Sequence, residues 1–438
     1  MSKVIYIETY GCQMNVADSE TVLSIVQSEN FGYTKDILKA DVIILNTCSV
    51  RDNAEQKIWN RLDYLKGLKR KNKSLKIGII GCMAQRIDRE LLENQTVDFV
   101  AGPDSYRNLP ELINETDIVP KVCNVEFNIN ETYSGINPIK TNENISGFIS
   151  ITRGCNNFCS YCVVPYTRGR ERSRDCKGIL NEVEYLKSVN CKEITLLGQN
   201  VNSYICETEK YPVNFPKLIE LTAETIPESR IRFTTSHPKD LSDELIKVIA
   251  DNKNICNHIH LPVQSGSNKI LKLMNRKYTR EWYLDRINTI KKIIPECGLS
   301  TDVFCGFSGE TEEDFQQTLD LMEHVKFDSA FMFKYSVRQG TYAAKNLPDD
   351  VPEETKIDRL NRMIELQNKI SLQNNKADIG KTFEVLIEGF SKRSDDMLFG
   401  RTQQNKVVVF FKKNVTKGEF VKVKITDASS ATLKGIII

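Results

Sequence analysis

Short apolar runs alternate with amphipathic helical stretches in the first 115 residues of this chain. The expected strands are Val4–Tyr10, Val42–Asn46 and Ile77–Ile80, and the expected helices are roughly Asp18–Asn30, Ala54–Leu68 and Arg86–Glu93. Such alternation is typical of a parallel sheet whose faces are covered by helices. We therefore expect a Rossmann-like parallel α/β domain over residues 1–118, followed by a linker over 119–145 that is rich in Asn, Thr and Gly.

A second and longer alternation follows the linker. Its expected strands are Phe148–Thr152, Glu193–Leu197, Arg230–Thr234, His258–Val263, Ser300–Phe304 and Ala330–Tyr335, with helical patterns such as Leu180–Val189, Ser242–Ala250, Tyr283–Ile294 and Glu312–Val325 between them. Six units are too few to close an eight-stranded barrel. We expect a partial (β/α)6 barrel over residues 146–375, closed by a helix over Glu353–Asn375, with its site at the carboxyl ends of the strands.

The tail changes to period-two strands with turn residues, at Phe383–Ile387, Val407–Phe411 and Phe420–Ile425. This pattern predicts a small β-barrel over residues 376–438. The whole chain has a formal net charge of +2, but from Lys376 onward 12 Lys and Arg stand against 7 Asp and Glu. The tail is therefore basic, which favours binding to a polyanion.

The chain has thirteen cysteines in 438 residues, no secretory start and no run of eighteen apolar residues. An odd cysteine count in a long chain of this kind favours metal ligation or burial in a reducing compartment, not a disulfide framework. We expect a cytoplasmic, monomeric protein with no membrane partner.

Three cysteines lie within eight residues at Cys155, Cys159 and Cys162, in the loop after the first expected barrel strand. The C-x3-C-x2-C spacing lets one short loop wrap three thiolates around a small iron–sulfur cube, which has four irons to ligate. One iron is then left open for chemistry. A zinc site is the alternative, but zinc needs a fourth Cys or His close by, and the next thiol is Cys176.

Three further cysteines occupy equivalent places in the first domain. Cys12, Cys48 and Cys82 each follow a predicted strand, after Gly11, Thr47 and Gly81. Because the carboxyl ends of parallel strands share one edge of a sheet, we expect these thiols to converge. They predict a second three-thiolate site, the alternative being ordinary buried cysteine.

Both groups of cysteines carry a family resemblance. The Cys155–Cys162 loop, with Tyr161 beside its last thiol, resembles the radical S-adenosylmethionine (SAM) enzymes. The strings Thr9-Tyr-Gly-Cys-Gln-Met-Asn15, Asn46-Thr-Cys-Ser-Val-Arg51 and Gly81-Cys-Met-Ala-Gln-Arg86 are similar to the amino-terminal domain of methylthiotransferases, and the tail resembles a TRAM domain. Together these resemblances span essentially the whole chain.

The resemblance implies two [4Fe-4S] clusters. The cluster on Cys155, Cys159 and Cys162 would cleave SAM to a 5′-deoxyadenosyl radical, and the auxiliary cluster on Cys12, Cys48 and Cys82 would deliver sulfur. One SAM would be the radical source and another the methyl donor, with an external electron donor. The target adenine carbon has a strong C–H bond and no leaving group, which suits radical attack.

Within the family, Gln13 and Met14 resemble the branch that adds a methylthio group to isopentenyl-adenosine at position 37 of tRNA. Alternatives are the branches acting on threonylcarbamoyl-adenosine in tRNA or on a ribosomal protein, which usually have other residues there. A non-catalytic iron–sulfur protein that binds RNA is a rival of another class, and a two-cluster electron carrier explains neither the barrel nor the basic tail.

Several further residues are predicted around the cofactor and substrate. Tyr161, Gln264, Gly306, Gly309 and Glu310 are expected near SAM, with Ser308 standing where the family usually has Pro. Glu310 is equally well explained as part of a helix start. The substrate or RNA contacts are expected from Arg168, Arg170, Arg172, Arg174 and Gln199, and from Lys392, Arg393, Arg401 and Lys406 in the tail. Phenylalanines between the basic tail residues offer faces for base stacking, and the expected partner is a tRNA anticodon stem-loop whose target base leaves the stack.

Overall fold

The first domain is a six-stranded parallel sheet with helices on both faces. The computed structural model describes residues 2–49, 52–139, 145–207, 211–392 and 394–438. The strands are β1 (Val4–Thr9), β2 (Gly32–Tyr33), β3 (Val42–Thr47), β4 (Lys76–Gly81), β5 (Phe99–Ala101) and β6 (Val122–Asn124), in the order β2-β1-β3-β4-β5-β6. All neighbouring pairs are parallel. The expected α/β domain is confirmed, and its three expected strands are β1, β3 and β4.

Helices cover the two faces of this sheet. Side chains of α1 (Gln13–Ser28) and α5 (Leu109–Glu115) pack with Ile5 and Ile44 on one face. Side chains of α2 (Asp52–Lys71), α3 (Cys82–Arg86) and α4 (Asp88–Glu93) belong to the other core, with Ile43 and Ile77. The expected helix from Arg86 is therefore two short helices, and β6 lies inside the expected linker.

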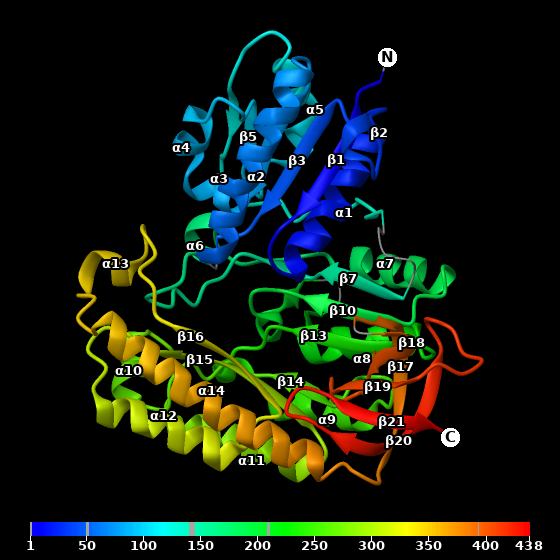
Figure 1. Ribbon diagram of the computed structural model, residues 1–438, viewed down its shortest axis with the longest axis vertical. Coiled ribbons are helices and arrows are strands. Elements are labelled where there is room, and N and C mark those ends of the chain that lie inside the picture. The colour runs from blue at the N-terminus through cyan, green and yellow to red at the C-terminus, as the bar shows by residue number, and fades with distance from the viewer. Residues whose placement is uncertain (1, 50–51, 140–144, 208–210, 393) are drawn as a thin grey trace.

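The central domain has the six parallel strands that the sequence predicts. They are β7 (Ser146–Ser150), β10 (Glu193–Leu197), β13 (Arg230–Thr234), β14 (His258–His260), β15 (Gly298–Cys305) and β16 (Ser329–Lys334). Hydrogen bonds join them as two three-stranded sheets, β13-β10-β7 and β14-β15-β16. The bridge of Ile231 to Ile255 extends the first sheet towards β14, so the six strands form one open barrel wall (Figure 1).

Helices cover the outside of this wall (Figure 1). They are α7 (Cys176–Ser188), α8 (Phe215–Thr225), α9 (Asp243–Asp251), α10 (Asn268–Leu273), α11 (Arg280–Ile293) and α12 (Glu312–Val325). The long helix α14 (Glu353–Lys376) packs against β16 and α12 and leads into the tail. Buried side chains of strands and helices form one large apolar core, including Ile149, Leu196 and Phe315.

The tail is a closed five-stranded barrel, as expected. Its strands are β17 (Thr382–Ser391), β18 (Ser394–Arg401), β19 (Val407–Phe411), β20 (Phe420–Ala428) and β21 (Leu433–Ile437), in the closed order β17-β18-β19-β21-β20. It docks on the central domain through two arginines. Arg230 donates to the carbonyls of Arg401 and Glu384, and Arg232 donates to those of Thr402 and Gln403.

No helix in the described part of the chain is long and apolar enough to cross a membrane.

Gly78 in β4 is a test of how tightly the first sheet is packed. A Cβ at this position would lie 2.0 Å from Cζ of the Phe99 ring on β5. We predict that Gly78→Ala destabilises the domain by about 1–3 kcal/mol, because the ring has no room to retreat in a packed core. The control is Gly67→Ala on the exposed side of α2, where nothing lies within 4 Å. That change should stabilise the helix by about 0.5–1 kcal/mol. Chemical denaturation measures both, and equal effects would contradict this packing.

Candidate active site

The cysteine segment of the central domain is held at its base by a small antiparallel ladder. Strand β8 (Thr152–Arg153) pairs with β9 (Arg172–Ser173), so the chain from 154 to 171 is a closed loop. Gly154 has φ +76°, and a Cβ there would lie 2.1 Å from the Arg170 carbonyl oxygen. Only glycine fits this crossing, which places Cys155 directly above the end of the first barrel strand.

The far end of the loop is tied to α10 and the chain after it. The Ser160 amide donates to the Met274 carbonyl at 3.0 Å, and its hydroxyl donates to the Leu273 carbonyl at 2.8 Å. Asn275 donates to the Phe158 carbonyl at 2.8 Å. The loop that carries the three cysteines is therefore held both at the end of the first barrel strand and at the end of α10.

Each thiol of this loop accepts hydrogen bonds from the surrounding protein. The amides of Asn157 and Val164 lie 3.5 Å from the sulfurs of Cys155 and Cys162. The guanidinium of Arg276 donates to Cys159 at 3.3 Å. Burial raises the pKa of Cys162 to about 12, and the neighbouring Cys159 and Cys155 add to the effect. Three crowded thiols with N–H donors aimed at them fit a positively charged metal group that would hold them as thiolates.

A single metal ion does not fit the described residues. Among them, no group of three or more His, Cys, Asp and Glu side chains is arranged to hold one ion. An iron–sulfur cube is larger than one ion and separates its thiolate ligands accordingly.

The three cysteines of the first domain lie at one edge of its sheet, as expected. Cys12 caps the amino end of α1 after β1, Cys48 follows β3, and Cys82 is the first residue of α3 after β4. Cys12 is exposed, whereas Cys48 and Cys82 are buried. A Cβ on Gly11, which has φ +132°, would lie 2.5 Å from the Cβ of Cys48, so the Cys12 loop lies directly on Cys48.

Two asparagines fix this edge. Asn15 donates to the side-chain oxygen of Asn46 at 3.0 Å and to the Thr47 carbonyl at 3.1 Å. Asn46 donates back to the Asn15 carbonyl at 2.8 Å. This buried clamp joins the residues just after Cys12 to those just before Cys48.

Hydrogen bonding also lowers the pKa of the Cys12 thiol. A hydrogen bond with Cys48 lowers the pKa of Cys12 to about 6 against the opposing effect of burial, and Arg168 lowers it further. The lowered pKa favours the thiolate form of Cys12, which is the form that ligates metals.

A buried ion-pair network brings the two groups of cysteines to one interface. Asp18 on α1 accepts from Arg153 at 2.8 Å and from Arg168 at 2.6 Å, and these arginines flank the Cys155–Cys162 loop. Arg168 also donates from Nε to Cys82 at 3.2 Å. Figure 1 shows α6 (Val164–Thr167), which leads into Arg168, between the first domain and the barrel. The residues that flank the Cys155–Cys162 loop are therefore docked on the domain that carries Cys12, Cys48 and Cys82.

The carboxyl group of Asp18 stays ionised in this network. Burial alone would raise the pKa of Asp18, but Arg168 and Arg153 together bring it below its usual value. The carboxylate remains ionised and paired. Arg168 is predicted to contact the substrate or RNA; in the structure it is 3% exposed and joins Asp18 to Cys82.

The other predicted arginines have separate roles. Arg172 pairs with Asp104 at 2.8 Å, and Arg174 pairs with Glu182 at 2.9 Å in the interior. Their charges are neutralised within the fold. Arg170 lies over the ring of Phe158, 4.3 Å from its centroid.

The residues predicted to lie near SAM include Tyr161 and the segment after β15. Tyr161 packs edge-on against Phe304 and Phe307. A Cβ on Gly306 would lie 2.3 Å from Cγ of Lys356, so this glycine makes room for α14 and not for a ligand. The Gly309 amide donates to Asp350 in an exposed turn, close to buried Ser308.

Glu310 has the structural role that the sequence left open. It accepts from the Gly306 amide at 2.6 Å and from Arg359 of α14 at 2.9 Å. Burial raises the pKa of Glu310 to about 7. The carboxyl group ties the turn before α12 to α14.

Polar atoms without partners gather at the carboxyl ends of four barrel strands. Gln264, at φ +70° after β14, and Gln199, after β10, each have a side-chain oxygen that is buried without a hydrogen bond. Three residues that the sequence did not single out also have a buried atom without a partner, which is the hydroxyl oxygen of Thr152 and of Ser236 and Nε2 of His237. Buried polar groups are normally paired. These atoms therefore fit a polar ligand at the barrel mouth.

His237 is the most defined of these residues. Its Nδ1 accepts from the Lys239 amide at 3.3 Å, which leaves the proton on Nε2. Burial, with help from Arg276 and Lys239, lowers the pKa of His237 to about 2, so the ring stays neutral. The signal for His237 in the sequence was the string Ser236-His237-Pro238, which comes shortly after strand β13.

The predicted RNA contacts of the tail differ in accessibility. Lys406 pairs with Asp378 and Asp328, at 2.6 and 3.1 Å, so its charge is neutralised within the fold, and its RNA contact stays a prediction. Arg401 pairs with Glu388 at 2.6 Å. Lys392 is exposed, and Arg393 lies outside the described residues.

The aromatic residues of the tail separate into core and surface. Phe410 is fully buried, whereas Phe390 and Phe411 are 53% and 66% exposed. The ammonium of Lys412 lies 5.1 Å from the centre of the Phe390 ring. Phe390, Phe411 and Lys412 thus offer flat faces beside a cation.

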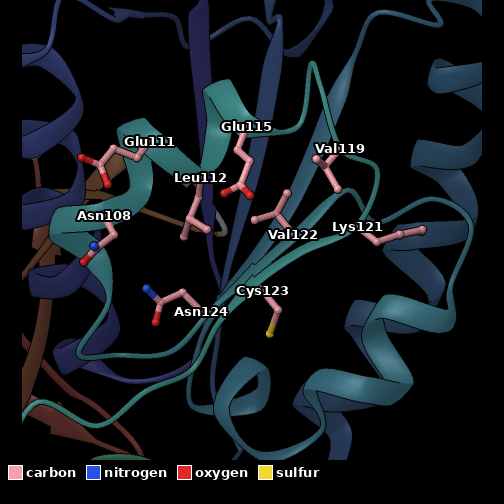
Figure 2. Close-up of a pocket in the computed structure, with 9 residues that line it drawn as sticks. All are labelled: Asn108, Glu111, Leu112, Glu115, Val119, Lys121, Val122, Cys123 and Asn124. Carbon is pink, nitrogen blue, oxygen red and sulfur yellow. The ribbon is translucent and has the colours of Figure 1, made fainter.

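A separate hollow of about 350 Å³ lies on the first domain, beside α5 and β6. Figure 2 shows its lining, with Cys123, Lys121 and Glu115 among the side chains. None of the six predicted ligand cysteines lines it, so it is not part of the candidate site.

The Asp18 network predicts a large effect of one substitution. Asp18→Ala would leave two buried guanidinium groups without their carboxylate, at a cost on the order of 3–5 kcal/mol. The control is Asp117→Ala, which removes the half-exposed pair with Lys3 and should cost under about 1 kcal/mol. Denaturation midpoints measure both. Equal losses would show that Asp18 does not hold the domain boundary.

Three segments of the chain match known protein families. Residues 149–322 match the Radical SAM superfamily, residues 4–102 match the Uncharacterized protein family UPF0004, and residues 376–438 match the TRAM domain. The first two segments lie within the central domain and the first domain, and the third spans the tail barrel.

Full-length relatives are similar to this chain. The tRNA-2-methylthio-N(6)-dimethylallyladenosine synthase of Parabacteroides distasonis is 61% identical over 98% of this chain and 94% of its own length. The protein of the same name from Azobacteroides pseudotrichonymphae is 62% identical over 98% and 96%.

Among solved structures, the radical S-adenosylmethionine methyltransferase TsrM from Kitasatospora setae is similar in fold. It has a TM-score of 0.60 and 14% sequence identity, and the match covers 78% of this chain and 77% of that chain.

Proposed function

Because this chain belongs to the family of tRNA-2-methylthio-N(6)-dimethylallyladenosine synthases, within the radical SAM superfamily, we propose that it adds a methylthio group to isopentenyl-adenosine at position 37 of tRNA. The full-length identity of about 60% is the observation that carries this assignment. It favours the isopentenyl-adenosine branch over those acting on threonylcarbamoyl-adenosine or on a ribosomal protein.

Six cysteines are the proposed ligands of two [4Fe-4S] clusters. Cys155, Cys159 and Cys162 would hold one, and Cys12, Cys48 and Cys82 would hold the other. The proposal is supported by the N–H donors aimed at the sulfurs of Cys155, Cys159, Cys162 and Cys82. When bound, the first cluster with SAM would supply the radical, and the second would supply the sulfur.

The residues of the barrel mouth would bind and orient SAM. The side-chain oxygens of Gln199 and Gln264 would accept from its amino or hydroxyl groups, and Nε2–H of His237 would donate to one of its acceptors. Each of these atoms is buried and otherwise lacks a partner. Tyr161, packed on Phe304 and Phe307, would exclude water from this region.

The tail barrel would grip the anticodon stem-loop. Exposed Phe390 and Phe411 would stack on bases, and Lys412 and Lys392 would contact phosphates. The target base would leave the loop stack to reach the boundary where the six thiols meet. An external electron donor completes the proposal. All thirteen cysteines are free thiols, which suits a reducing compartment.

The test of this function is the modification state of tRNA in the cell. A strain whose only copy of the chain carries Cys12→Ala, Cys48→Ala and Cys82→Ala should accumulate unmodified isopentenyl-adenosine. Nucleoside mass spectrometry reads the result. The assignment would be overturned if threonylcarbamoyl-adenosine lost its methylthio group while isopentenyl-adenosine kept its own.

The same triple variant separates the two clusters in the purified protein. After anaerobic reconstitution it should retain about half the iron and sulfide of the wild type, since one of two proposed clusters remains. It should still cleave SAM after reduction. A wild-type protein that binds iron but never cleaves SAM would favour the non-catalytic RNA-binding alternative.

RNA binding by the tail gives a further prediction. Lys412→Ala should weaken anticodon stem-loop binding and reduce the slope of log affinity against log salt by about 0.7–0.9, the value for one lost phosphate contact. Phe411→Ala should cost about 1–3 kcal/mol of stacking. Lys66→Ala, an exposed lysine on α2, is the matched control. Fluorescence anisotropy at several salt concentrations measures all three, and identical slopes for Lys412→Ala and Lys66→Ala would contradict the role of the tail.

A further inference from the structure

In each group of cysteines, one thiol accepts a hydrogen bond from a buried arginine. Arg168 donates from Nε to Cys82 at 3.2 Å, and Arg276 donates from Nη1 to Cys159 at 3.3 Å. The two arginines are 3% and 4% exposed. Their charges therefore act in a poorly screened interior, where a hydrogen bond to sulfur is strengthened.

Each guanidinium is held in place by its other nitrogens. Arg168 donates to Asp18 at 2.6 Å. Arg276 donates to the Pro262 carbonyl at 2.9 Å and to the Tyr278 hydroxyl at 3.0 Å. These bonds fix the planar group so that its remaining N–H faces a sulfur. Nη1 of Arg168 is also buried and has no hydrogen-bond partner.

The charge balance at the boundary is positive on the side of the first domain. Asp18 is one carboxylate shared by two arginines, Arg153 and Arg168. Arg153 makes its other hydrogen bond with the Pro103 carbonyl, which carries no net charge. One net positive charge is thus left in this buried network, beside Cys82.

We propose that Arg168 is a positioning residue that raises the reduction potential of the cluster on Cys12, Cys48 and Cys82, and that Arg276 does the same for the cluster on Cys155, Cys159 and Cys162. Reduction adds negative charge to a cluster, and hydrogen bonds and positive charge at its sulfurs stabilise the reduced form. Each arginine contacts a thiol of one group, so the two potentials are set separately. The inference rests on the proposed clusters.

Two full-length backgrounds isolate the clusters for measurement. The chain with Cys155, Cys159 and Cys162 changed to alanine retains only the auxiliary site, and the chain with Cys12, Cys48 and Cys82 changed retains only the other. Arg168→Gln and Arg276→Gln are placed in each background. Iron is quantified first, and the midpoint potential is then measured by redox titration followed by electron paramagnetic resonance.

We expect Arg168→Gln to disfavour reduction of the auxiliary cluster about tenfold, a shift of ~59 mV to more negative potential for a one-electron couple. The other cluster should not change. Arg276→Gln should show the reverse selectivity. Unchanged potentials, or equal shifts of both clusters in each variant, would overturn the inference.

Asp18→Asn distinguishes tuning from loosening of the domain boundary. It weakens the ion pair but keeps the Arg168 donor to Cys82 and removes a negative charge, so the auxiliary potential should rise or stay constant. A fall like that of Arg168→Gln would mean that both act through the fold, and would overturn the inference. If the background lacking Cys155, Cys159 and Cys162 binds no iron, the proposed auxiliary cluster itself fails. If the cluster binds but its potential does not shift in Arg168→Gln, only the proposed role of Arg168 fails.

Discussion

The carboxylate of Asp18 is the contact on which the arrangement of the site depends. It lies on α1 of the first domain, six residues after Cys12, and binds both Arg153 and Arg168 of the central domain. These arginines stand on either side of the Cys155–Cys162 loop. One buried carboxylate therefore registers one group of thiols against the other. Burying three charges is costly unless each is paired, so the domains have a strong preference for this single docking geometry.

The rest of the structure supports this registration from outside. The β8–β9 ladder closes the cysteine loop at its base, and Ser160 ties it to the chain after α10. In the first domain, Asn15 and Asn46 hold the thiol-bearing edge. The tail barrel is fixed to the central domain by Arg230 and Arg232. The tail, which we propose binds RNA, is thus docked directly on the domain that carries the Cys155–Cys162 loop.

The sequence predicted the parts of the molecule that local pattern determines. Strand–helix alternation indicated both α/β domains, and strand-end position brought Cys12, Cys48 and Cys82 together. Residue identity could not give pairing across domains. Arg168 and Lys406 looked like RNA contacts because they are basic, but Asp18 and Asp328, each in another domain, bind them in the fold. Gly306 suggested a ligand, yet its missing Cβ accommodates Lys356 of α14. The orphaned polar atom of His237 is visible only once its neighbours are placed.

The most direct test of this arrangement is the magnetic interaction between the two clusters in the reconstituted, reduced protein. Electron paramagnetic resonance should show spectra broadened by coupling in the wild type, because Asp18 holds the two groups of thiols at one boundary. Spectra of the two triple-cysteine variants should be narrow and uncoupled. A wild-type spectrum equal to the simple sum of the two variants' spectra would contradict the claim that the two sites face each other.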